Sequence, residues 1–136
     1  MYPELPFESL IPGIPVSHQA KGRGSLQRWK AHVTTKMRED LPEGNFAFER
    51  PLAVRLYFFP QARLEADIDN CAKPILDAMG GCVYLDDRQV ECLLVQKFEP
   101  GRPLPVDDVT GCLKTPMEAE EPVIYVRVDA APGDER

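Results

Sequence analysis

Alternating apolar and polar positions predict the strands of this chain. The clearest run is Leu52–Phe59, which is rich in β-branched and aromatic residues and is ended by Pro60. Alternate residues of this run form one apolar face, and the opposite face is also apolar apart from Arg55. A strand of this kind is covered on both sides, so we expect it near the centre of a sheet.

Shorter alternations predict strands over residues 7–11, 82–84, 90–98 and 123–128. The first of them lies among prolines, which a sheet tolerates at its edge. The second and third are separated by the acidic pair Asp86-Asp87. Two strands joined by an acidic turn predict a β-hairpin.

Helical spacing occurs in two segments, of which the first follows a loop containing Gly22 and Gly24. Ser25 is the predicted N-cap of a helix that runs to about Arg38. The apolar residues of this helix recur with the helical period at Leu26, Trp29, Val33 and Met37. This spacing favours Trp29 as a core residue over a role in base stacking.

The second predicted helix ends at residue 79, where Gly80 and Gly81 can adopt the left-handed backbone conformation of a helix terminus. Asp69 or Asn70 is its predicted N-cap. Pro74 would then lie near the first turn, where proline costs least. Together the elements predict an α/β (α+β) fold with a mixed β-sheet flanked by helices.

Length and composition fit a single compact domain. The chain has 136 residues, 43% of them hydrophobic, and it contains no internal repeat. We expect one domain over residues 1–136, with partly irregular tails at residues 1–16 and 129–136. No apolar run approaches the roughly 20 residues that span a bilayer, and the N-terminus lacks a signal-peptide pattern, so we expect a cytoplasmic protein.

Charge is distributed unevenly along the chain, whose net charge is −6. Residues 17–38 contain six basic residues and no acidic one, which leaves 10 basic against 22 acidic residues elsewhere. An overall acidic field argues against a protein that coats nucleic acid with its whole surface. The sequence therefore predicts a basic arm on an acidic body.

The four cysteines form no C-x-x-C pair, and no secretory context favours disulfides. Free thiols that pack as small apolar residues are the expected state of Cys71, Cys82, Cys92 and Cys112. A zinc site would need clustered ligands, and the two histidines lie far from the cysteines in sequence.

Three acids, Asp67, Asp69 and Asp87, are the candidate metal ligands. The first two are two residues apart in chain expected to be extended, so their carboxylates would project to one side, and Asp87 can approach from the hairpin turn. Crowded carboxylates repel one another, and a divalent cation neutralises them. Oxygen ligands without usable His or Cys indicate Mg²⁺ or Mn²⁺, and the number of ions stays open.

Lys73 is the candidate cationic group of the same segment. It stands four residues after Asp69, on the same face of the predicted helix, where it can offset charge in a phosphoryl-transfer transition state. The alternative is an ordinary i,i+4 ion pair with Asp69 or Asp77.

A longer pattern contains these residues and is far more specific than the common D-x-D and D-D pairs. It reads Asp67-x-Asp69-Asn70-x-x-Lys73-Pro74-x-x-Asp77-Ala78-Met79, then Asp86-Asp87-x-Gln89-Val90. The pattern resembles the RusA family of Holliday-junction resolvases, closely over residues 66–95 and more weakly over residues 13–17. The resemblance implies that Asp67, Asp69 and Asp87 are metal-binding catalytic acids and that Lys73 is the essential lysine, with supporting roles for Asn70, Asp77 and Asp86.

The resemblance also implies a small RusA-like homodimeric nuclease that cuts paired strands of a four-way DNA junction with Mg²⁺ or Mn²⁺, in DNA recombination and repair. A junction binder contacts many phosphates, whereas this chain is acidic. The basic arm therefore supplies the candidate DNA contacts Lys21, Arg23, Arg28 and Lys30. The alternative is that these charges form a solvated helix face.

Two other functions remain open at the level of sequence. One is a RusA-like dimer that binds branched DNA without cutting it, which the acidic body favours and the intact motif disfavours. The other is a metal-dependent phosphohydrolase that acts on a small substrate. The sequence has no phosphate-binding glycine loop followed by lysine to support the second.

Overall fold

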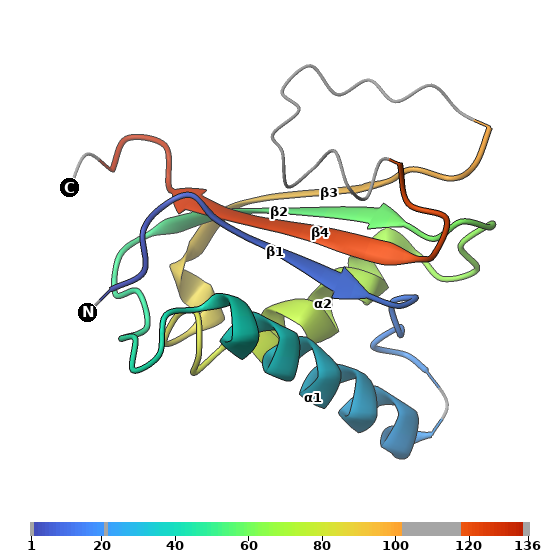
Figure 1. Cartoon of the computed structure of the whole chain (residues 1–136), viewed down its shortest axis with the longest axis horizontal. Helices are drawn as coiled ribbons and strands as arrows, with labels where there is room; N and C mark the ends of the chain where they lie inside the picture. Colours follow the sequence, from blue (N-terminus) through green and yellow to red (C-terminus); the bar gives the residue numbers. More distant parts are fainter. Residues whose placement is uncertain (1, 21, 102–117, 135–136) are drawn as a thin grey trace.

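The computed structural model describes residues 2–20, 22–101 and 118–134. Its four-stranded sheet carries two α-helices on one face (Figure 1). In chain order the elements are β1 (Phe7–Pro12), α1 (Arg23–Asp40), β2 (Leu52–Phe59), α2 (Ile68–Met79), the short 3₁₀-helix η1 (Asp87–Gln89), β3 (Val90–Lys97) and β4 (Val123–Ala130). The predicted α+β fold with a mixed sheet is confirmed.

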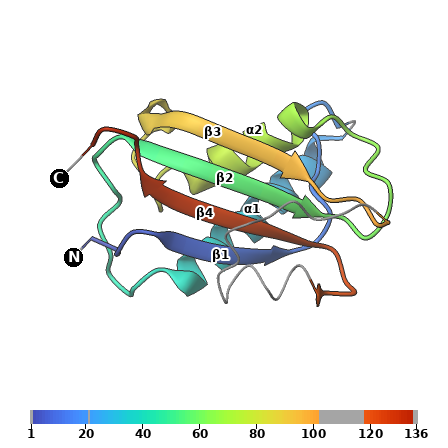
Figure 2. The same cartoon turned by 90° about the horizontal axis from the view of Figure 1, so that it is seen from above.

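The strands are ordered β1-β4-β2-β3 (Figure 2). β2 pairs antiparallel with β4 and parallel with β3, so that Leu56 lies between Val126 and Val95. The proline-containing β1 pairs only with β4 among the described strands. The central place of β2 and the edge place of β1 are as predicted from sequence.

The predicted hairpin over residues 82–98 is wrong. Residues 82–84 form a turn in which Tyr84 makes isolated bridges to Phe48 and Gly80, and β3 pairs in parallel with β2. Parallel neighbours need a long crossover connection, and α2 supplies it. The acidic segment Asp86-Asp87 leads through η1 directly into β3 and does not join two strands.

Both helices begin earlier than their predicted caps. α1 has Gly22 at its N-cap position, ahead of Ser25, and α2 has Asp67 at its N-cap position, so that Asp69 and Asn70 lie inside the helix. The predicted caps follow side-chain preference, but the helical backbone extends beyond them. No helix in the part of the chain that the structure describes is long and apolar enough to cross a membrane.

Because α2 starts early, Pro74 lies in its interior and not near its first turn. Proline has no N–H to donate to the carbonyl four residues earlier, which here belongs to Asn70. That carbonyl instead accepts a hydrogen bond from the His18 backbone N–H at 2.7 Å. Pro74 thus leaves an acceptor on α2 that ties down the segment preceding α1.

The main core lies between the helices and the sheet. On α1, Trp29, Val33 and Met37 are buried and Leu26 is half-buried, which confirms the predicted apolar stripe. On the opposite face of the sheet, a second cluster consists of the aromatic residues Tyr57, Phe59, Phe98 and Tyr125. This cluster explains why both faces of β2 are apolar.

Cys71, Cys82 and Cys92 are free thiols, as predicted. The first two are buried and the third is exposed on β3, so the packing role applies only to the buried pair. Cys112 lies outside the described residues.

Candidate active site

Asp67 and Asp69 lie at the N-terminal end of α2, and both are exposed. The expectation that both belong to extended chain is wrong for Asp69, which lies in the first helical turn. Neither carboxylate has a hydrogen-bond or ion-pair partner among the described residues. Burial raises the pKa of the nearby Cys71 thiol to about 11, and the charges of the two carboxylates add to this effect.

Lys73 connects α2 to the acidic turn. Its Nζ lies 2.9 Å from Asp77 Oδ1 on the same helix and 3.0 Å from Asp87 Oδ2 on η1. The hydrogen bond to Asp77, and to a smaller extent the one to Asp87, raises the pKa of Lys73 above its ordinary value. The i,i+4 ion pair with Asp77 therefore forms, and a second contact links Lys73 to a predicted catalytic acid.

Asp87 is placed by the local structure of η1. Asp86 occupies its N-cap position, and the Asp86 side chain accepts a hydrogen bond from the Arg88 backbone N–H at 2.9 Å. This bond and the Arg88 side chain lower the pKa of Asp86. No separate role for Gln89 was predicted from sequence, although D-x-x-Q is a capping-box pattern, and a capping box between Asp86 and Gln89 is present.

Among the described residues of the basic arm, Lys30 contacts the site. Lys30 Nζ on α1 lies 3.5 Å from Asp77 Oδ2, so Lys30, Asp77, Lys73 and Asp87 form a continuous chain of ion pairs. Arg28 is exposed on α1. Lys21 and the side chain of Arg23 lie outside the described residues.

The carboxylate oxygens of the predicted site are donors that suit a hard divalent cation. Asp67 and Asp69 offer exposed carboxylates without partners in the described chain, and Mg²⁺ binds such oxygen ligands while retaining waters. Among the described residues, no group of three or more His, Cys, Asp or Glu side chains is arranged to hold a metal ion. Asp67, Asp69 and Asp87 therefore do not form such a group, and Asp87 contacts Lys73.

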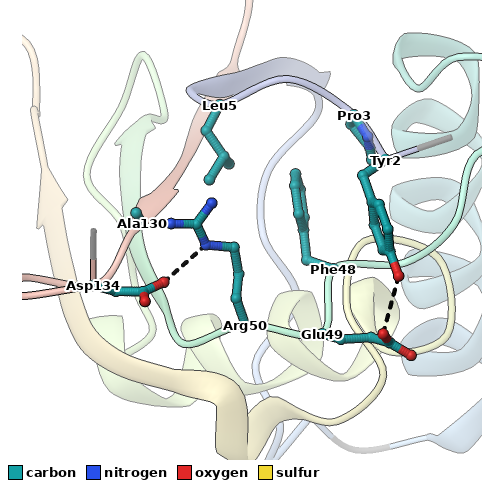
Figure 3. A pocket seen from close by; sticks show the side chains of 8 residues that line it. All are labelled: Tyr2, Pro3, Leu5, Phe48, Glu49, Arg50, Ala130 and Asp134. Atoms are coloured by element: carbon teal, nitrogen blue, oxygen red, sulfur yellow. Dashed lines mark hydrogen bonds and ion pairs between the residues drawn. The ribbon is translucent and has the colours of Figure 1, made fainter. Parts of the chain in front are cut away.

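A pocket of about 720 Å³ lies apart from these acids and is lined by Tyr2, Pro3, Leu5, Phe48, Glu49, Arg50, Ala130 and Asp134 (Figure 3). None of these eight residues belongs to the predicted site. The pocket therefore does not mark the chemistry that the sequence predicts.

A lysine in contact with two carboxylates, on a crossover helix that begins with two exposed carboxylates, provides groups suited to hydrolysis of phosphate esters. The family model described as Endodeoxyribonuclease RusA matches residues 16–106, which include α1, β2, α2 and β3. The chain therefore belongs to the RusA endodeoxyribonuclease family of phosphodiester hydrolases, which act on Holliday junctions and generally depend on Mg²⁺. No curated protein matches this chain.

Proposed function

We propose that this chain forms a single RusA-like nuclease domain that acts as a homodimer and resolves four-way DNA junctions by paired cuts, with Mg²⁺ as cofactor. The observation that carries the proposal is the position of Lys73, whose ammonium lies 3.0 Å from Asp87. Both residues belong to the family match, and Lys73 shares α2 with Asp69. Motif residues separated in sequence thus lie together in space.

Asp67, Asp69 and Asp87 are the proposed Mg²⁺ ligands. A bound Mg²⁺ would lower the pKa of a water molecule and stabilise the leaving oxygen of the cleaved phosphodiester. Two of these ligands are carried by α2 and its N-cap, while the third is carried by η1. The distance between the turn and the helix therefore determines whether one cation can reach all three.

Lys73 is the proposed cationic group for the transition state. A lysine is an ammonium at neutral pH, and the hydrogen bonds to Asp77 and Asp87 raise the pKa of Lys73 further. Phosphodiester hydrolysis builds negative charge on the phosphate oxygens, which a fixed ammonium stabilises. Asp77 contacts both Lys73 and Lys30, so it orients the catalytic lysine against α1.

The basic arm is the proposed DNA contact, through Lys21, Arg23, Arg28 and Lys30. Phosphate contacts supply most of the affinity of a junction binder, and the remainder of the chain is acidic. Support comes from Lys30, which pairs with Asp77, the same carboxylate that pairs with the proposed catalytic lysine. DNA held by α1 would thus present its backbone to α2.

Cleavage of a synthetic four-way junction, compared with a linear duplex of the same sequence, tests the proposal. The assay is run with Mg²⁺, Mn²⁺ or EDTA on the wild type, Asp67→Asn and Asp87→Asn. Glu91→Gln, which removes the same charge from an exposed position on β3, is the matched control. We expect paired, metal-dependent nicks from the wild type and Glu91→Gln, and none from the two aspartate variants.

Binding separates the outcomes. Asp67→Asn should retain or improve junction binding, because one negative charge facing phosphate is removed. Junction binding by a wild type that never cuts would instead indicate a binding-only dimer. If neither binding nor cutting occurs, the proposal fails, and a salt-insensitive activity on small phosphate esters would indicate a phosphohydrolase.

A further inference from the structure

Gln89 uses the whole hydrogen-bonding capacity of its side chain. Its Oε1 accepts from the backbone N–H groups of Leu85 at 2.9 Å and Asp86 at 3.0 Å. Its Nε2 donates to the backbone carbonyls of Phe48 at 2.7 Å and Arg50 at 3.1 Å. A glutamine amide has two donors and an acceptor with two lone pairs, so all four positions are filled.

The two carbonyls that Gln89 binds belong to a well-anchored segment. Phe48 is 3% exposed, and its N–H donates to the Val83 carbonyl at 2.9 Å. The Arg50 side chain pairs with Asp134 at 2.8 Å, and Tyr2 donates to Glu49 at 3.0 Å (Figure 3). Residues 48–50 therefore form a fixed support against which the acidic turn is held.

Apart from the ion pair between Lys73 and Asp87 and the capping contacts within η1, the described residues give the acidic turn little other support close to Asp87. η1 is only three residues long and has no buried residue, and Leu85, Asp86 and Arg88 are exposed. Gln89 joins the start of this turn to the segment that leads into β2. Without this link, the exposed ion pair between Lys73 and Asp87 would remain to hold Asp87 against α2, and exposed ion pairs are weak, so the turn could move relative to Lys73 and Asp69.

We infer that Gln89 is a positioning residue for the nuclease reaction, because it sets the distance between Asp87 on η1 and the groups on α2. The inference rests on the proposed function. Gln89 itself touches neither Asp87 nor Lys73 through a hydrogen bond among the described residues, so it acts through the backbone of residues 85–87. Asp87 remains chemically intact when Gln89 is changed.

The side-chain chemistry makes glutamine specific at this position. Methionine has similar length but neither a strong donor nor a strong acceptor, so it would remove all four bonds. Ionised glutamate would keep the two accepted bonds, but its oxygens would face the carbonyls of Phe48 and Arg50 without a proton to donate. Both variants should loosen the turn, and methionine should do so without adding charge.

The test compares Gln89→Met and Gln89→Glu with the wild type, using Gln96→Met on β3 as the matched control. Single-turnover cleavage of the four-way junction gives the rate, gel-shift titration in Ca²⁺ gives the Kd for DNA, and titration calorimetry gives the Kd for Mn²⁺. Hydrogen exchange, followed by NMR in metal-free buffer, reports the Leu85 and Asp86 amides.

We expect both Gln89 variants to cut about 10- to 100-fold more slowly, since small misplacements of catalytic groups have effects of this size. The Kd for junction DNA should stay within about twofold, and Mn²⁺ binding should weaken by about tenfold or more. The Leu85 and Asp86 amides should exchange at least about tenfold faster in Gln89→Met, because their acceptor is lost. Gln96→Met should match the wild type throughout.

Three results would overturn the inference. They are a cleavage rate of Gln89→Met equal to that of the wild type, unchanged exchange of the Leu85 and Asp86 amides in Gln89→Met, and equal losses of cleavage rate and of DNA affinity in the Gln89 variants. A wild type that cuts no DNA refutes the proposed function and the catalytic part of the inference with it. The exchange measurement still decides in that case whether Gln89 holds the turn.

Discussion

At the scale of single residues, Lys73 forms two ion pairs, one with Asp77 on its own helix and one with Asp87 on η1. Its side chain is 46% exposed, and its partners Asp77 and Asp87 are 28% and 37% exposed. Ion pairs with this degree of exposure contribute about 1 kcal/mol or less to folding because water screens them. The ion pairs of Lys73 therefore contribute little to stability, whereas the role that we propose for its ammonium lies in the reaction.

Replacing Lys73 with methionine should separate these two effects. We expect Lys73→Met to slow junction cleavage by at least about a hundredfold, because the charge that we propose to stabilise the transition state is lost. The melting temperature should change by no more than about 4 °C. Lys97→Met on β3, which removes a lysine 3.6 Å from Glu99, is the control and should cut normally. Wild-type cleavage by Lys73→Met would contradict the proposed role.

Cys71 should make the protein less stable in alkali. Burial, helped by Asp67 and Asp69, raises its pKa from 9.0 to about 11, so the folded protein holds the thiol proton more tightly than the unfolded chain. This stabilisation is complete below the unfolded pKa and is lost as pH rises through the folded one. When the pH is raised from 8 to 10.5, the free energy of unfolding, measured with urea, should fall by up to about 2 kcal/mol more for the wild type than for Cys71→Ala. Equal losses of unfolding free energy would show that folding does not shift the pKa of the Cys71 thiol.

At the scale of elements, the end of β1 is fixed against α1 by a close approach. Gly13 has φ 126°, and a Cβ built on it would lie 3.1 Å from Trp29 Cζ3. The Gly13 N–H donates to the Pro122 carbonyl at 2.9 Å, which ties the same turn to the start of β4. Backbone conformation and packing both require glycine here.

Gly13→Ala should therefore destabilise the fold by about 2–4 kcal/mol, from backbone strain together with overpacking against Trp29. Gly44→Ala is the control, because Gly44 also has positive φ but a Cβ added to it would meet no atom of the described residues within 4 Å. Gly44→Ala should lower the free energy of unfolding by about 1 kcal/mol. Urea unfolding at pH 7 measures both, and equal losses would show that the Trp29 contact adds nothing.

The sequence predicted elements well where local pattern decides them, and pairings poorly. The run Leu52–Phe59 has the same bounds in the structure as in the prediction, because apolar β-formers and Pro60 define it locally. The hairpin failed because parallel pairing of β3 depends on the crossover through α2, which no short pattern encodes. In the site, the motif predicted the position of Lys73 on α2, but not its contact with Asp87.

At the scale of the whole molecule, charge is distributed unevenly along the chain. The chain carries net charge −6, yet no acidic residue occurs among residues 17–38. Within this segment, Lys30 forms an ion pair with Asp77. Arg28, which precedes Lys30 on α1, is exposed. Phosphate contacts should therefore be few and concentrated on the first half of α1.

This arrangement gives a measurable salt dependence. The logarithm of the junction-binding constant should fall linearly with the logarithm of salt concentration, and Arg28→Ala should reduce the slope by about 1, the effect of one lost phosphate contact. Arg38→Ala, in the last turn of α1 and close to Glu39 and Asp40, is the control and should leave the slope unchanged. Equal slopes for both variants and the wild type would mean that α1 is a solvated face, and that the DNA contacts of this acidic protein lie elsewhere.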